Sequence, residues 1–262
     1  MESCVHPLIG QLQPIFNELH SSTAATLPSV ILKLEYIIGD EGDTFFQGSA
    51  GGEFRASHSG LSNWVNTQIK DLFSKSETQL AGILCTKALL GTDYIGSNSL
   101  LQFFLQLLEG SVRSSDVVVS EKSAEVWGLL LNNSGSFAEG TAQTRLKTCI
   151  KDLRMTGDAV DKVAASLFLC QLLKHTPSTV VPYLHLVFEG IRVALRDLSE
   201  RVRVNAACVL QYALSVMYTS MGSSTVIKLL DSFLGDSLNG LESKKRTCSM
   251  VPFCVLTLYF FL

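Results

Sequence analysis

Four segments of the chain align without gaps: AGILCTKALL from Ala81, SAEVWGLLLN from Ser123, AASLFLCQLL from Ala164 and AACVLQYALS from Ala206. Their first residues are separated by 42, 41 and 42 positions. Each segment opens with two small residues and carries a leucine or valine three positions further on. Each also has a leucine eight positions in, namely Leu89, Leu131, Leu172 and Leu214. A fixed period of this length indicates a helical repeat architecture.

The apolar positions within each segment recur at helical spacing. Offsets of three, four and seven or eight residues place them on one stripe of an α-helix. The small pair at the head of the stripe allows the backbone of a neighbouring helix to approach, whereas a large residue there would push adjacent repeats apart. We therefore predict that the four segments are equivalent helices, called inner helices here, of consecutive helix pairs.

An apolar run precedes each inner helix and predicts the first, outer helix of each pair. These runs are residues 61–74, 100–108, 146–153 and 180–195. Residues suited to capping precede the inner helices: a Ser76 to Gln79 capping box, Asp158 and Ser199. Strand signals are scarce. The predicted fold is all-α, a right-handed α-solenoid of antiparallel helix pairs with a period of 41–42 residues.

The fourth unit, VVPYLHLVFEGIRVALRDLSERVRVNAACVLQYAL, resembles a HEAT repeat. The matching residues are Pro182 early in the outer helix, Asp197 at the turn, Val202 with Arg203, and Ala206, Ala207 and Leu210 on the inner helix. The resemblance implies that Asp197 and Arg203 form a ladder linking neighbouring turns. It implies that Val202, Ala206 and Ala207 pack between helices. The other three units lack the Asp…Val-Arg signature, so the armadillo subclass stays open.

The sequence predicts four parts. Residues 1–38 hold two helices, 7–20 and 27–38, that form a degenerate cap repeat; residues 39–60 form a Gly-rich loop; residues 61–240 form the array. A second loop is expected over 132–144. Residues 241–262 are a basic and then apolar tail that leaves the repeat pattern after Lys244. Its final 13 apolar residues contain Pro252 and fall short of the ~20 that span a bilayer. We expect a truncated form or a fragment of a larger protein.

Composition excludes several classes of protein. Hydrophobic residues make up 47% of the 262 residues and the net charge is -3, so the chain is neither disordered nor globally basic. The seven cysteines include no C-x-x-C pair, which favours free thiols in a reducing compartment. The N-terminus has no basic region followed by an apolar run, so no signal peptide is expected. Cytoplasm or nucleus is the expected location.

No motif predicts catalysis, and we expect a chain that is not an enzyme and takes no cofactor. The five histidines form no H-E-x-x-H motif and share no metal-ligand spacing with cysteines or carboxylates. Neither a phosphate-binding glycine loop nor a nucleophile elbow is present. His175 is expected at a helix C-terminus, where the helix dipole favours its charged form. Trp64 and Trp127 fall in apolar stripes and are expected in the core.

Two groups of basic residues are the candidate interaction sites. Arg192, Arg196 and Arg201 surround one repeat turn, interleaved with acidic residues, and a salt-bridged face is favoured over a phosphate site. A second, mildly basic surface holds Arg145, Lys147, Lys151, Arg154 and Lys162.

The leading functional hypothesis is a non-enzymatic scaffold that binds partner proteins, as peptides or helices, on a concave surface. The alternatives are a nucleic-acid-associated or chromosome-maintenance scaffold and a membrane-associated adaptor that uses the tail. The oligomeric state stays open.

Overall fold

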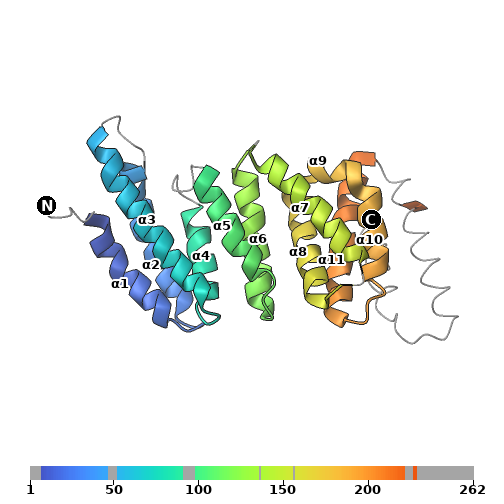
Figure 1. Ribbon diagram of the computed structural model, residues 1–262, viewed down its shortest axis with the longest axis horizontal. Coiled ribbons are helices and arrows are strands. Elements are labelled where there is room, and N and C mark those ends of the chain that lie inside the picture. The colour runs from blue at the N-terminus through green and yellow to red at the C-terminus, as the bar shows by residue number, and fades with distance from the viewer. Residues whose placement is uncertain are drawn as a thin grey trace. The chain divides into compact units, whose positions relative to one another are not determined.

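The computed structural model describes residues 7–46, 52–90, 98–135, 137–155, 157–221 and 227–228. Over these residues the chain forms helices and turns and no strand, in agreement with the predicted all-α class. It divides into two compact units, Met1–Asn133 and Ser134–Leu262. Each unit is described by itself, with the helix labels of Figure 1.

Unit 1 contains three consecutive helix pairs. They are α1 (Pro7–Ser21) with α2 (Leu27–Phe46), α3 (Gly52–Ser74) with α4 (Gln79–Leu89), and α5 (Asn98–Ser111) with α6 (Val117–Asn133). First helices pack on first helices, α1 on α3 and α3 on α5. Second helices pack on second helices, α2 on α4 and α4 on α6. The pairs follow one another in chain order across unit 1 (Figure 1).

Unit 2 repeats this packing with two pairs. The first is α7 (Phe137–Arg154) with α8 (Ala159–His175), and the second is α10 (Leu184–Ala194) with α11 (Glu200–Met221). The short helix α9 (Pro177–Val180) and a 3-10 turn (Val181–Tyr183) connect them. As in unit 1, first helix packs on first helix, α7 on α10, and second on second, α8 on α11.

The inner helices supply a large part of the core. The four leucines that define the repeat lie on α4, α6, α8 and α11, and their exposed fractions are 0–3%, which confirms that they are buried. Helix α8 is buried around most of its circumference, including Lys162 to Cys170 without a break. A helix that is apolar on nearly every side must be covered by neighbours on nearly every side. In unit 2 these neighbours include α7 and α11.

Small residues at the heads of the inner helices permit close packing. On α4, a Cβ atom added to Gly82 would meet the buried Phe73 ring at 2.8 Å and Leu72 Cβ at 3.3 Å. Hydroxyl groups at such positions are satisfied within their own helices. Thr86, Ser123 and Ser166 each donate to the carbonyl four residues earlier, at 2.9, 2.7 and 2.8 Å. Polar small residues therefore fit these sites without an unpaired hydroxyl.

Two predicted loops are wrong. Helix α2 continues to Phe46 and α3 begins at Gly52, so helix occupies most of 39–60. Likewise α6 ends at Asn133 and α7 begins at Phe137, and Gly135 with φ of 56° occupies the turn between them. Glycine lowers helix stability by only ~1 kcal/mol per residue relative to alanine, which flanking helix can absorb. Glycine content alone was therefore a poor guide to loops.

Of the other predicted helix boundaries, one is confirmed and two are wrong. The Asp158 side chain caps α8 by accepting from the Val160 N–H at 3.3 Å, as expected. The Ser76 to Gln79 capping box is wrong, because Thr78 occupies the N-cap of α4 and its hydroxyl donates to the Leu72 carbonyl at 2.7 Å. The outer helix expected over 180–195 is broken. Pro182 lies in the 3-10 turn, since proline disrupts an α-helix interior.

Of the two tryptophans expected in the core, Trp127 is fully buried and Trp64 is half-buried. Trp64 stacks edge-on against Phe16 at 5.4 Å between ring centroids. The tail, residues 241–262, lies outside the described residues.

We predict that Gly82→Ala destabilises the protein, whereas Gly110→Ala does not. The added methyl at residue 82 meets the Phe73 ring, and overpacking of this kind costs ~1–3 kcal/mol. Gly110 on α5 has nothing within 4 Å of the added Cβ, so the higher helix propensity of alanine should raise stability by up to ~1 kcal/mol. Urea unfolding midpoints measure both effects. Equal shifts in the two variants would contradict the close approach at Gly82.

Candidate interaction surfaces

A partly buried ion cluster joins the two helix pairs of unit 2. The Lys162 ammonium on α8 donates to Asp197 Oδ2 in the turn between α10 and α11. Asp197 Oδ1 accepts from the Ser199 N–H at 2.9 Å. Arg203 donates to the carbonyls of Asp197 and Leu198, both at 2.9 Å. Asp197 thus joins its own turn to the preceding inner helix.

Electrostatics favour the ionised form of Asp197. Burial by itself would raise the pKa of this carboxyl. The hydrogen bonds from Lys162 and from the Ser199 N–H, together with the charges of Lys162 and Arg203, outweigh burial and hold the pKa below its ordinary value. Only 9% of the Lys162 side chain and 14% of that of Asp197 is exposed. The pair is therefore weakly screened by solvent.

The remaining residues of the HEAT signature lie on α11 and in the 3-10 turn before α10. Val202 and Ala206 are fully buried on α11. Ala207 is only half-buried, and Pro182 is exposed in the 3-10 turn. Lys162 was assigned to a basic surface instead of to this cluster. It precedes Asp197 by 35 residues, which differs from the 41–42-residue period, so the repeat does not pair the two residues in the sequence.

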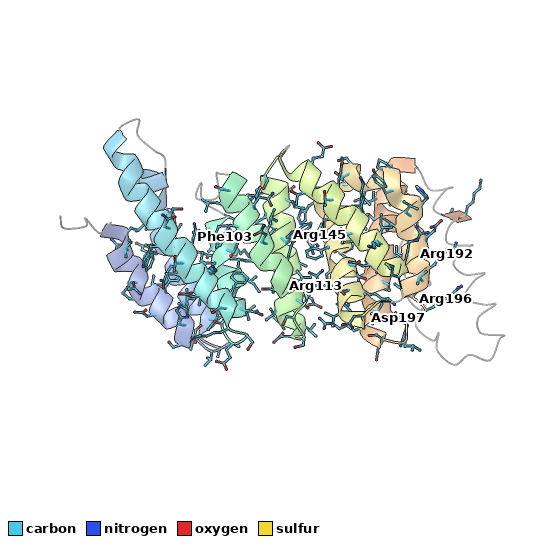
Figure 2. The ribbon with its side chains drawn as sticks, in the orientation of Figure 1. Phe103, Arg113, Arg145, Arg192, Arg196 and Asp197 are labelled. Atoms are coloured by element: carbon cyan, nitrogen blue, oxygen red, sulfur yellow. The ribbon has the colours of Figure 1, made fainter. Side chains whose placement is uncertain are left out.

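Arg192 lies on α10 and Arg196 in the turn that follows it (Figure 2). Arg201 is the second residue of α11. Arg196 is exposed, while Arg192 and Arg201 are half-buried. Acidic groups lie among them, including Glu189 and Asp197. Arginines interleaved with carboxylates in this way suit a salt-bridged face.

Two of the five residues of the second basic surface, Arg154 and Lys162, form ion pairs. Lys162 is buried in its ion pair. The Arg154 guanidinium pairs with Glu189 Oε2 at 3.0 Å, and the Arg145 guanidinium lies 4.8 Å from the centroid of the Phe168 ring. Lys147 and Lys151 remain as exposed lysines of this group. A strong phosphate-binding field requires more basic groups than these two.

Unit 1 presents a mixed apolar and charged surface on its inner helices. Lys87 on α4 donates to Glu125 Oε1 on α6 at 3.1 Å, and Lys122 donates to Glu125 Oε2 at 2.7 Å. The hydrogen bond from Lys122 is the largest of the effects that lower the pKa of Glu125. Leu84 and Leu129, one helical turn from this cluster on the same two helices, are half-buried. We call these five residues the α4–α6 surface.

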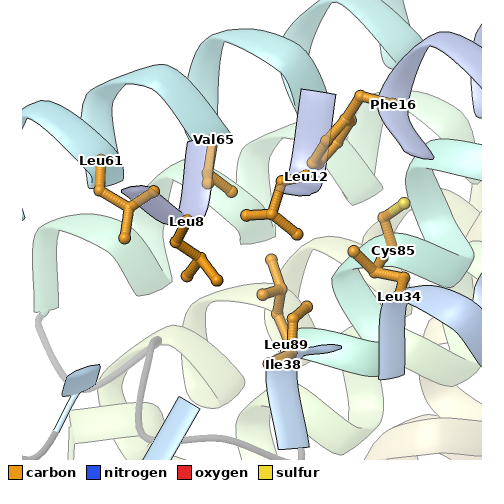
Figure 3. A pocket seen from close by; sticks show the side chains of 9 residues that line it. All are labelled: Leu8, Leu12, Phe16, Leu34, Ile38, Leu61, Val65, Cys85 and Leu89. Atoms are coloured by element: carbon orange, nitrogen blue, oxygen red, sulfur yellow. The ribbon is translucent and has the colours of Figure 1, made fainter. Parts of the chain in front are cut away.

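Described residues of unit 1 enclose a small apolar cavity. A cavity of about 10 Å³ lies among α1, α2, α3 and α4 (Figure 3). Its lining consists of aliphatic side chains, Phe16 and the Cys85 thiol. Burial raises the pKa of Cys85, which keeps it protonated and unreactive. A cavity of this size without polar partners is a packing defect.

Chemistry-bearing residues do not converge elsewhere in the described ranges. No group of three or more His, Cys, Asp or Glu residues there is arranged to hold a metal ion. His175 ends α8, but burial, followed by the charge of Lys174, lowers its pKa, so the expected stabilisation of its charged form is wrong. His185 is exposed on α10. Of the helices described, none is both long and apolar enough to cross a membrane.

Comparison with known proteins gives two partial matches. No family model matches the chain. It is similar to serine/threonine-protein kinase TOR2 of Saccharomyces cerevisiae, 28% identical over 173 residues, and to serine/threonine-protein kinase tor1 of Schizosaccharomyces pombe, 25% identical over 159 residues. Each match covers 60% of this chain, but the chain spans about 7% of the length of these curated relatives. The matches and the helical fold are compatible with a HEAT-like repeat superfamily.

We predict that Lys162→Met lowers the free energy of unfolding by ~2 kcal/mol. The substitution leaves the Asp197 carboxylate partly buried without its ammonium partner. Lys151→Met is the matched control, because Lys151 is exposed on α7 and should change stability by less than ~0.5 kcal/mol. Urea denaturation of both variants gives the comparison. A loss no larger than that of the control would show that the pair does not tie the repeats together.

The pH dependence of stability should also report on Asp197. Its pKa is lower in the folded than in the unfolded chain, where the ordinary value is 3.8. Its contribution is therefore present above about pH 4 and lost as the pH falls through the folded value. The Asp197→Asn variant lacks this pH-dependent contribution. Its free energy of unfolding should therefore fall less than that of the wild type between about pH 6 and about pH 3. If the free energies of unfolding of the variant and the wild type fall equally with pH, the lowered pKa of Asp197 is contradicted.

Proposed function

We propose that this chain is a non-enzymatic, HEAT-like scaffold that binds partner proteins along the inner helices of a solenoid. The observation that supports the proposal most is the packing order in each unit, first helix on first helix and second on second. Stacking of this kind places inner helices side by side and creates an extended binding surface. The kinase activity in the names of the two relatives belongs to those proteins.

The α4–α6 surface is the best supported site for a partner. Leu84 and Leu129 offer partly exposed apolar area, and the ion pairs of Glu125 with Lys87 and Lys122 hold polar groups beside it. An apolar centre with a polar rim suits an amphipathic peptide or helix. The proposed location for this interaction is the cytoplasm or nucleus.

We predict that Leu84→Gln with Leu129→Gln weakens partner binding by ~10-fold or more, because truncating an apolar anchor typically costs over ~1 kcal/mol. The matched control is Phe103→Gln with Leu107→Gln, two half-buried residues on the outer helix α5. Partners captured from cell extract with nuclease present would be identified by mass spectrometry. Their Kd values would then be measured with purified protein.

The control should bind as the wild type does. Equal losses in the two double variants would reject the α4–α6 surface. Capture that disappears with nuclease would instead favour nucleic-acid association.

A further inference from the structure

One side of α11 is exposed and carries no charge. The charged residues of this helix all lie in its first turn, and no Asp, Glu, Lys, Arg or His occurs in residues 204–221. The exposed residues between 204 and 220, called the α11 face here, are Val204, Cys208, Gln211, Tyr212, Ser215, Tyr218, Thr219 and Ser220. Val204, Tyr212 and Tyr218 are 44%, 39% and 48% exposed. An uncharged helix face of this length is unusual next to solvent.

The 42-residue alignment relates the α11 face to a buried face of the preceding inner helix. Aligning Ala206 with Ala164 places Cys208, Gln211, Tyr212 and Ser215 opposite Ser166, Leu169, Cys170 and Leu173 of α8. These four α8 residues are only 0–8% exposed, and α8 packs on α11. Positions that are covered on α8 are thus uncovered on α11. A helix of the same kind is therefore the partner that this face fits.

The exposed positions have the spacing of a contact between two long helices. Val204, Cys208, Gln211, Ser215 and Tyr218 follow one another at intervals of four, three, four and three residues. At this heptad spacing two helices can pack side by side along their length. Small residues at positions 208 and 215 permit the backbones to approach, and the tyrosines on either side supply contact area.

The α11 face is also symmetric about the midpoint between Gln211 and Tyr212. Reversing the helix about that point exchanges position 204 with 219, 208 with 215 and 211 with 212, and all six positions are exposed. An antiparallel contact between two copies of one helix needs this symmetry, because each exposed residue must meet an exposed residue of the other copy. A charge near such an axis would meet its own like charge, and residues 204–221 contain none.

We propose that the α11 face binds the α11 face of a second copy of this chain, as an antiparallel helix pair with two-fold symmetry. Cys208 of one protomer then lies opposite Ser215 of the partner subunit, and the two copies of Tyr212 meet near the axis. The contact closes at two copies, whereas a contact between unlike faces would continue into a filament. This inference does not depend on partner binding at the α4–α6 surface.

Sedimentation equilibrium of the full chain, under reducing conditions, measures this association. Tyr212→Glu should raise the Kd of the dimer at least ~10-fold, because it places two carboxylates beside each other at the axis. Tyr36→Glu is the matched control, since it makes the same change at a tyrosine that is 72% exposed on α2, and it should leave the Kd unchanged. Urea unfolding of both variants verifies that they are folded.

A charge-swapped pair of variants keeps the test decisive if Tyr212→Glu also lowers stability. Tyr212→Glu and Tyr212→Lys should each be monomeric alone, and an equal mixture of the two should form a heterodimer, because opposite charges then meet at the axis.

Three results would overturn the proposal. The first is a wild type that stays monomeric up to ~100 μM, as it would if the α11 face were covered within the chain. The second is a Tyr212→Glu variant that associates as the wild type does. The third is association that Tyr36→Glu abolishes, since α2 would then provide the contact.

Discussion

The structure depends on one constraint: an inner helix that is buried on nearly every side cannot exist alone. Helix α8 has almost no polar side to give to solvent, so α7 and α11 must cover it. Burial of its apolar side chains contributes the main stabilisation, at about 25 cal/mol per Å². This burial also explains the small residues at the start of the inner helices, because contact on several sides requires short distances between helix backbones. Gly82 beside Phe73 is the tightest described example.

In unit 2, charged side chains mainly form contacts that hold neighbouring helix pairs together. Two ion pairs join one helix pair to the next. Lys162–Asp197 links α8 to the turn between α10 and α11, and Arg154–Glu189 links the outer helices α7 and α10. Arg145 lies over Phe168. Three of the five residues of that basic group, Arg145, Arg154 and Lys162, are therefore engaged within the fold. The α4–α6 surface differs, because its charged groups flank partly exposed leucines.

The helix order and the buried leucines could be predicted because they depend on local periodicity, which the sequence displays directly. The lengths of α2, α3 and α7 could not be predicted. The glycines in 39–60 and 132–144 suggested loops, but cooperative helix formation extends the helices through most of these residues. The partner of Asp197 was also missed. The HEAT resemblance pointed to Arg203, but Arg203 bonds to backbone carbonyls, and the ammonium comes from Lys162 in the preceding pair. Only tertiary packing brings those two residues together.

Packing between consecutive pairs has a mechanical consequence. Within each unit the contacts between pairs join neighbours along the chain, so tension applied along it loads these interfaces one after another. Release of one pair of about 40 residues would add up to roughly 130 Å of extended chain. Each pair is thus an extensible element, and its resistance is set by the ion pairs and small-residue contacts at its border. A segment built in this way would lengthen stepwise under tension, one helix pair at a time.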